Sequence, residues 1–150
     1  MPLIAPLLLL MFIGQLMFSI VTTNDANITL NDKEIEAVGQ NMLVYSTYAR
    51  RYANANPALV GAVNSAAIGF PTWYVPPAQV ANYMSGGKAY VYYTGQLKGL
   101  PYYLVSSTQD GFRAGINVNG VLASPTVPST ATTGLVIPAA VPNGAVVLMP

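Results

Sequence analysis

The first two dozen residues set the strongest limit on how this chain can fold. Residues Pro2 to Val21 include no charged residue, and their only clearly polar side chains are those of Gln15 and Ser19. A helix of about 20 residues rises about 30 Å, which matches the hydrocarbon core of a bilayer. The segment therefore predicts a transmembrane anchor at residues 1–24, followed by one folded domain at residues 25–150.

A cleaved signal peptide and a buried core helix are the alternatives for this segment. A signal peptide carries Lys or Arg before its apolar run and ends at a site of small residues, whereas Thr22-Thr23-Asn24-Asp25 follows here. We therefore favour an uncleaved anchor. Because the α-amino group is the only positive charge before the run, we expect the N-terminus in the cytoplasm and the C-terminal domain on the far side of the membrane.

The composition argues against several classes of function. Only 11 of the 150 residues are charged, the net charge is +1, and Arg50-Arg51 is the only adjacent basic pair, so nucleic acid is not expected as a partner. The chain has no cysteine and no histidine, which removes the thiolate nucleophile, the usual general base and the usual metal ligands. We expect no enzymatic activity, no cofactor and no small-molecule substrate.

An amphipathic helix is predicted from Asp32 to about Ala55. Asn31 is a suitable N-cap, with Glu34 three residues later, and Asn56-Pro57 ends the pattern. The apolar positions recur at spacings of three and four, which places them on one face. They are Ile35, Val38, Met42, Tyr45, Ala49 and Tyr52.

Part of this apolar stripe is predicted to bind a partner. A helix of roughly 24 residues is about 36 Å long, whereas the strands of a small sheet span about 17–20 Å. We therefore expect Ile35, Val38 and Met42 to face a partner while the other three residues meet the sheet. Packing of the whole stripe on the protein's own core is the alternative.

The remainder predicts a small, mainly antiparallel sheet, so the fold class is α+β: a transmembrane helix, an amphipathic helix and then the sheet. Short helices are expected at 58–68 and 77–84, and a surface loop at 124–133. The β-rich runs are separated by turn residues, of which Asp110-Gly111 and Asn119-Gly120 are hairpin signals. The expected strands are 89–93, 102–105 and 116–118, with a C-terminal hairpin of 136–137 and 145–148 at the sheet edge.

Two other features carry weaker functional signals. Ser85-Gly86-Gly87-Lys88 matches the S-x-x-K spacing of a serine nucleophile and a lysine base, but two glycines disfavour the helix that aligns such a pair. A Gly-Gly turn into a strand is the favoured interpretation, and an envelope serine hydrolase that uses Ser85 and Lys88 is an alternative function. The ten tyrosines suit strand packing first and partner contacts second.

Three segments carry a resemblance to a known family. They are the apolar start, the helix Gln40-Asn41-Met42-Leu43-Val44-Tyr45 through Tyr52-Ala53-Asn54-Ala55-Asn56-Pro57, and Ile68-Gly69-Phe70-Pro71-Thr72-Trp73-Tyr74-Val75-Pro76. With the chain length, they resemble the PilM family encoded with plasmid thin pili, a type IVb conjugative system, and not the actin-like cytoplasmic protein that shares the name. The resemblance implies a non-enzymatic, single-pass component of the bacterial inner membrane with a periplasmic domain. It would act as a scaffold in pilus assembly or in the basal body, with other assembly proteins or pilins as partners.

A minor pilin-like subunit built into the fibre is the alternative within the same class. An apolar N-terminal helix that continues into an amphipathic half and a C-terminal sheet is similar to a pilin. However, Ser19 stands at the fifth position after Gly14, where the prepilin-peptidase pattern requires Glu.

Overall fold

The computed structural model describes residues 31–126 and 134–149. The chain divides into two units, 1–34 and 35–150, and the sheet lies in the second. The anchor predicted at 1–24 falls outside the described residues, as does most of the loop predicted at 124–133. Among the described residues, no helix combines the length and the apolar character needed to cross a membrane.

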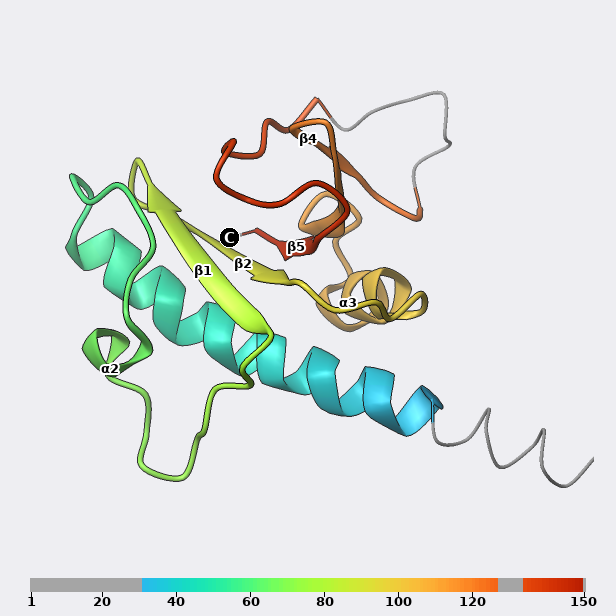
Figure 1. Ribbon diagram of the computed structural model, residues 1–150, viewed down its shortest axis with the longest axis horizontal. Coiled ribbons are helices and arrows are strands. Elements are labelled where there is room, and N and C mark those ends of the chain that lie inside the picture. Colours follow the sequence, from blue (N-terminus) through green and yellow to red (C-terminus); the bar gives the residue numbers. More distant parts are fainter. Residues whose placement is uncertain (1–30, 127–133, 150) are drawn as a thin grey trace, which may run out of the picture. The chain divides into compact units, whose positions relative to one another are not determined.

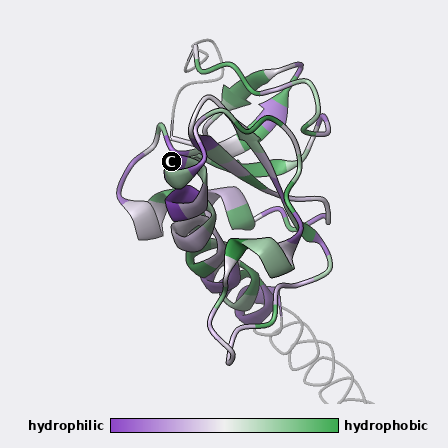
Figure 2. Cartoon of the chain, turned by 90° about the vertical axis from the view of Figure 1, so that its left-hand side faces the viewer, coloured by the Kyte–Doolittle hydropathy of each residue, from purple (hydrophilic) through white to green (hydrophobic). Residues whose placement is uncertain are grey.

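The described chain begins with a long helix over residues 31–55. Hydrophobic and hydrophilic residues alternate along its ribbon (Figure 2). Asn56 ends the helix, where its backbone N–H donates to the carbonyl oxygens of Tyr52 and Ala53, both at 3.1 Å, immediately before Pro57. The predicted amphipathic helix is therefore present.

A five-stranded antiparallel sheet follows the long helix (Figure 1). Its strand order is β1-β2-β5-β3-β4, so the last strand in the sequence lies at the centre. The short helix α2 (Ser65–Ile68) precedes the sheet, and α3 (Leu100–Thr108) connects β2 to β3. The strands are β1 (Val80–Ser85), β2 (Lys88–Tyr93), β3 (Ala114–Val118), β4 (Val121–Ala123) and β5 (Val146–Leu148). The predicted α+β class, a helix followed by an antiparallel sheet, is confirmed.

The sheet separates two hydrophobic cores. Because side chains alternate along a strand, Val91 and Tyr93 face the long helix, whereas Tyr90 and Tyr92 face the other side. The larger core joins the long helix, α3 and the sheet. The smaller core joins the opposite face to residues 135–149 and includes Leu122, Ile137, Val141 and Val147.

Helix α3 is the main departure from the sequence-based expectation, because residues 102–105 were predicted as a strand. The run Tyr102-Tyr103-Leu104-Val105 has high strand propensity, but Pro101 occupies the first turn of a helix, where its missing N–H is not needed. The apolar side chains of Leu100, Leu104 and Val105 are buried. Packing of this face against the sheet and the long helix outweighs local strand propensity.

Two predicted helices before the sheet are also wrong. Of residues 58–68, only the four residues of α2 are helical, capped by Asn64, whose side chain accepts a hydrogen bond from the Ala66 N–H at 2.9 Å. Most of residues 77–84 belong to β1, where alternate side chains are buried. Asn82 made this strand hard to recognise because asparagine is depleted in strands.

The C-terminal strand does not form the predicted edge hairpin. Val147 of β5 lies opposite both Tyr92 of β2 and Gly115 of β3, and Val136 forms a bridge with Val121 of β4 instead. All three residues of β5 are buried, as the central position of the strand requires. The hairpin predicted at Asn119-Gly120 is confirmed between β3 and β4, whereas Asp110-Gly111 joins α3 to β3.

Candidate interaction surface

The apolar stripe of the long helix packs on the protein's own core. Ile35 and Met42 have only 8% and 0% of their surface exposed, contrary to the expectation that they face a partner. Gly99, in the turn before α3, lies against the Ile35 side chain, and Tyr103 of α3 lies against Gly39 of the long helix. The sequence did not predict that α3 would cover this part of the helix. Val38 is half-buried against the same core, and its contact with a partner stays a prediction. The other predicted members, Tyr45, Ala49 and Tyr52, also pack in or against this core.

Gly39 shows how closely α3 approaches the long helix. A Cβ atom at this position would lie 2.3 Å from Cδ1 of Tyr103. Beside it, the Gln40 side-chain amide donates a hydrogen bond to the Tyr103 hydroxyl at 2.8 Å. The glycine is therefore needed for the contact between the two helices.

Ser85 and Lys88 flank the turn that joins β1 to β2, directly opposite each other in the ladder. Gly86 and Gly87 both have positive φ, 57° and 74°, which fits the tight turn of a two-residue hairpin. This placement agrees with the favoured interpretation of a Gly-Gly turn. Ser85 is half-buried and Lys88 is exposed, at the tip of a hairpin and not on one helix face.

The described residues also offer little for metal binding. Across residues 31–126 and 134–149, no three His, Cys, Asp or Glu side chains are grouped as a metal ion would require.

The loop between α2 and β1, residues 69–79, is the most exposed apolar feature near the long helix. We call it the Trp73 loop. In Figure 1 it is the green segment that extends past the long helix, away from β4. Trp73 has 71% of its surface exposed and Val75 has 80%. Two strongly exposed apolar side chains within one loop make it a candidate contact surface.

Aromatic contacts fasten this loop to the long helix. The ring of Phe70 lies 4.8 Å from that of Tyr45, 5.7 Å from that of Tyr48 and 5.0 Å from that of Tyr74, measured between ring centroids. These tilted and edge-on arrangements are the favourable ones for aromatic pairs. Trp73 contacts only the edge of this cluster, 6.0 Å from Tyr74, and keeps its outer surface free of the cluster.

Tyr74 provides the polar part of the attachment. Its side chain is buried, and its hydroxyl donates a hydrogen bond to the carbonyl oxygen of Asn41 in the long helix at 2.9 Å. Burial, with a smaller contribution from nearby Tyr45, raises the pKa of Tyr74 from 10.0 to about 12. The hydroxyl therefore stays protonated as a donor throughout the physiological range.

A second buried group links the segment before the loop to the sheet. Asn82 of β1 accepts a hydrogen bond from the Val63 N–H at 2.9 Å and donates to the Val63 carbonyl oxygen at 2.8 Å. Its amide also donates to the Tyr45 hydroxyl at 2.7 Å. The segment before the loop is thus tied to β1, the strand after it, and β1 is tied to the long helix.

A shallow hollow of about 260 Å³ lies between α2 and the Trp73 loop, lined in part by Phe70, Pro71 and Pro76. It is smaller than the usual small-molecule site of about 300–1,000 Å³. Its size suits one side chain of another protein. The sequence had drawn attention to residues 68–76 through the family resemblance, but not as a contact surface. The sequence pattern that could have indicated a contact surface here was the alternation of aromatic residues and prolines in a loop.

Comparison with known proteins identifies the family. The family model described as PilM matches residues 8–149. The chain belongs to the PilM family. The resemblance drawn from the sequence is therefore confirmed, and the Trp73 loop lies within the matched range.

Two solved structures were found to be similar to this chain. A PilM protein of Escherichia coli B7A is 20% identical, with a TM-score of 0.58 over 79% of this chain and 93% of that chain. A PilM protein of Pseudomonas aeruginosa 2192 is 26% identical, with a TM-score of 0.48 over 77% of this chain and 94% of that chain. No curated protein matches the chain. The first similarity supports the helix-and-sheet fold.

Proposed function

We propose that this protein is a non-enzymatic, membrane-anchored scaffold of a type IVb pilus-assembly apparatus, of the conjugative kind encoded on plasmids. It binds other assembly proteins or pilins through the Trp73 loop. Membership of the PilM family supports the pilus-related role. The anchor, the periplasmic side of the domain and the absence of catalysis rest on the sequence, namely the uncharged run from Pro2 to Val21 and the lack of cysteine and histidine.

The observation that carries the scaffold proposal is the contrast within one loop between buried anchors and exposed apolar residues. Phe70 and Tyr74 hold the backbone against the long helix, while Trp73 and Val75 project into solvent. A side chain on a fixed backbone loses less entropy on binding than one on a free loop. Tryptophan is also among the residues that most often dominate binding energy at protein interfaces. The loop therefore suits a partner with an apolar pocket.

The test replaces Trp73 and Val75 by serine in the full-length chain and counts assembled pili. We expect at least a tenfold loss of pili, because a lost hot spot of about 2 kcal/mol weakens binding by more than tenfold. The midpoint of thermal unfolding should stay nearly unchanged, since both side chains are exposed. Tyr102→Ser is the matched control, because Tyr102 is an aromatic residue with 64% of its surface exposed on α3. Normal pilus numbers in the Trp73/Val75 variant would refute the proposal.

The minor pilin alternative shares the observed order of a long helix followed by an antiparallel sheet. Fractionation of cells after shearing of the pili separates the two. A scaffold remains in the membrane fraction when pili are sheared from the cells, whereas a pilin subunit leaves with the fibres. We expect the chain in the membrane fraction.

A further inference from the structure

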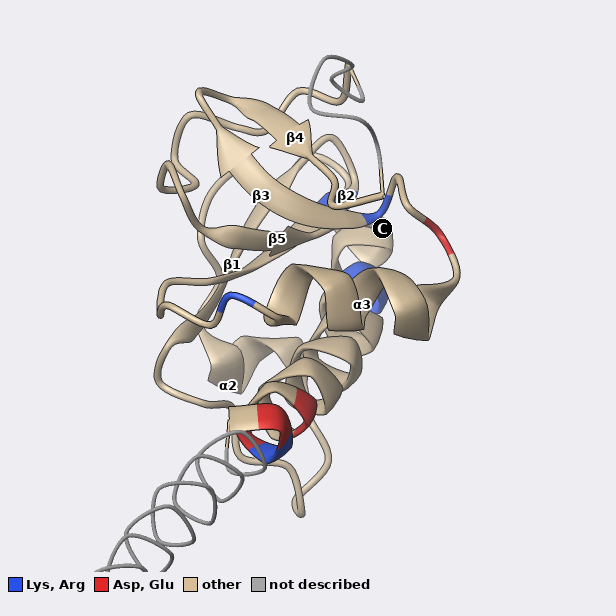
Figure 3. Ribbon diagram, turned by 90° about the vertical axis from the view of Figure 1, so that its right-hand side faces the viewer, with Lys and Arg blue, Asp and Glu red and all other residues tan. Residues whose placement is uncertain are grey.

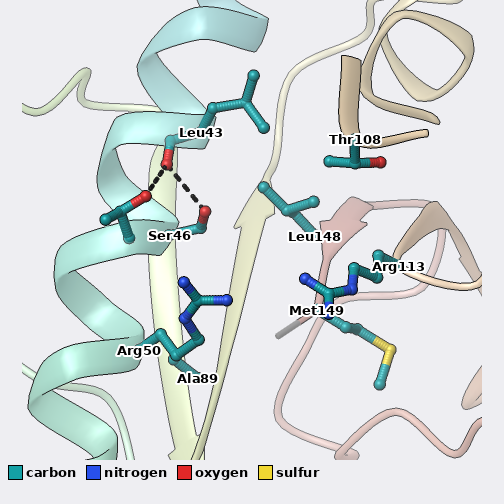
Figure 4. A pocket seen from close by; sticks show the side chains of 9 residues that line it. Leu43, Ser46, Arg50, Ala89, Thr108, Arg113, Leu148 and Met149 are labelled. Carbon is teal, nitrogen blue, oxygen red and sulfur yellow. Dashed lines mark hydrogen bonds between the residues drawn. The ribbon is translucent and has the colours of Figure 1, made fainter. Parts of the chain in front are cut away.

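A second hollow lies on a different part of the fold from the Trp73 loop. It has a volume of about 180 Å³ and lies between the long helix, the start of β2, the end of α3 and the C-terminal end of β5. Figure 4 shows Arg50 and Arg113 reaching toward it from opposite sides. The side chains of Leu43, Ala89 and Leu148 form its apolar part.

The concentration of positive charge here is unusual for this chain. The protein has only three arginines, and two of them line this hollow. The third, Arg51, is turned to the ring of Tyr48, with its guanidinium carbon 5.4 Å from the ring centroid. Figure 3 shows how sparse charged residues are along the described chain. Two cations at one small hollow therefore favour an anionic ligand.

Within residues 31–126 and 134–149, an acidic partner lies close to Arg113 but not to Arg50. Arg113 Nε lies 3.0 Å from a carboxylate oxygen of Asp110, and both side chains are substantially exposed. An exposed pair of this kind is worth little, so its exchange for another carboxylate costs little. Asp110 offsets one positive charge and leaves the hollow with a net charge of about +1.

The hydroxyl groups at the hollow are already used as donors. Ser46 and Thr47 donate to the Leu43 carbonyl oxygen at 2.9 and 3.0 Å, and Thr108 donates to the Leu104 carbonyl oxygen at 2.8 Å. The donors left for a ligand are thus the guanidinium groups, which match a planar carboxylate with two parallel hydrogen bonds. Phosphate sites in proteins more often use backbone N–H groups at helix N-termini or nests.

We propose that this hollow binds a glutamate side chain of a partner polypeptide. Its volume is too small for a typical small-molecule ligand and fits one side chain. Its apolar part would cover the two methylene groups of a glutamate while Arg50 and Arg113 bind the carboxylate. The proposal depends on the proposed function only in taking the partner to be a protein.

The three arginines make a direct test possible. The full-length chain, labelled with ¹⁵N-arginine and held in a neutral detergent, gives three Nε signals, of which that of Arg51 is an internal control. The probe is a pentapeptide with one glutamate between glycines, blocked at both ends, and the matched peptide carries glutamine. We expect the signals of Arg50 and Arg113 to shift together and saturably with the glutamate peptide only. Arg50→Gln and Arg113→Gln should each weaken binding about fivefold, whereas Arg51→Gln should not.

Several outcomes would overturn the proposal. Equal shifts of all three arginines would indicate general screening, and equal shifts with both peptides would exclude carboxylate recognition. Inorganic phosphate that binds as tightly as the glutamate peptide would indicate a small-anion site. Vesicles of anionic phospholipid that shift the same two signals while the peptide does not would indicate a membrane contact. None of these readouts depends on pilus assembly, so failure here leaves the Trp73 experiment unaffected.

Discussion

Tyr74 is the residue where burial and a single hydrogen bond most directly fix the candidate surface. Its hydroxyl donates to a helix carbonyl, and the raised pKa of about 12 records how unfavourable the phenolate is at this position. Removal of the hydroxyl should lower the free energy of unfolding by about 1 kcal/mol at neutral pH. Tyr74→Phe is therefore expected to be folded and slightly less stable.

The pH dependence of the stability of this variant tests the raised pKa of Tyr74. Between pH 10 and about 12 the unfolded chain loses the Tyr74 proton while the folded protein keeps it. The unfolded state then binds fewer protons, so this residue makes the free energy of unfolding fall as pH rises through that window. Between pH 9 and pH 11, the free energy of chemical unfolding should fall less for Tyr74→Phe than for the unchanged protein. Equal losses would contradict the assigned pKa.

Asn82 and Asn117 show which single residues the sequence did not reveal. Each is a buried strand residue whose amide holds a neighbouring segment: Asn82 holds Val63, and Asn117 donates to the carbonyl oxygens of Val141 and Pro142 at 2.9 and 3.1 Å. A buried amide is tolerated when its hydrogen bonds are complete. Val63 lies 19 positions from Asn82, and Val141 and Pro142 lie 24 and 25 positions from Asn117, so no local pattern predicts these contacts.

At the scale of elements, the contact between the long helix and α3 depends on Gly39. Alanine is the better helix former by about 1 kcal/mol, so Gly39→Ala would stabilise an isolated helix. In this fold its Cβ would meet the Tyr103 ring, and such overpacking typically costs about 1–3 kcal/mol. We therefore expect Gly39→Ala to lower the midpoint of denaturant unfolding.

A double-mutant cycle tests whether the Tyr103 ring is the cause of this destabilisation. In a Tyr103→Ala background the obstructing ring is gone, and Gly39→Ala should become stabilising by about 0.5–1 kcal/mol. A change in the sign of the Gly39→Ala effect on stability would show that the Tyr103 ring causes the destabilisation. If Gly39→Ala destabilises equally in both backgrounds, the ring contact is not the cause.

Elements with a local signal were predictable from the sequence, and those decided by distant contacts were not. The long helix has a periodic stripe, β2 has a β-rich run, and Gly86-Gly87 and Asn119-Gly120 have turn chemistry; all are present. Helix α3 and strand β1 were assigned to the wrong type because packing overrode local propensity. The central position of β5 depends on pairing between residues 30 or more positions apart, which no local sequence pattern predicts.

The candidate surface was predictable only in part. The sequence pointed to the long helix and assigned Ile35, Val38 and Met42 to a partner, without a signal that α3 would cover this region. It also drew attention to residues 68–76. However, exposure of Trp73 depends on Phe70 and Tyr74 being held by Tyr45 and Asn41, a contact between segments that only the folded chain brings together.

For the molecule as a whole, the described residues include two surfaces that could contact a partner. Two cores on opposite faces of one sheet stabilise the domain, and the chain carries few charges. The exposed apolar side chains of Trp73 and Val75 stand on a fixed loop, and the two arginines at a small hollow give a second, polar surface. Under the proposals above, both features would recognise side chains of partner proteins, as a scaffold requires.

Site-specific photo-crosslinking at position 73 tests whether the Trp73 loop contacts a pilus component. A photoreactive aromatic amino acid replaces Trp73 in the full-length chain, in cells that assemble pili, and the crosslinked products are identified by mass spectrometry. The same replacement at exposed Tyr102 is the control. We predict products with a pilus-assembly protein or a pilin from position 73 and not from position 102. Products without any pilus component, or the same products from both positions, would contradict the proposed role of the Trp73 loop.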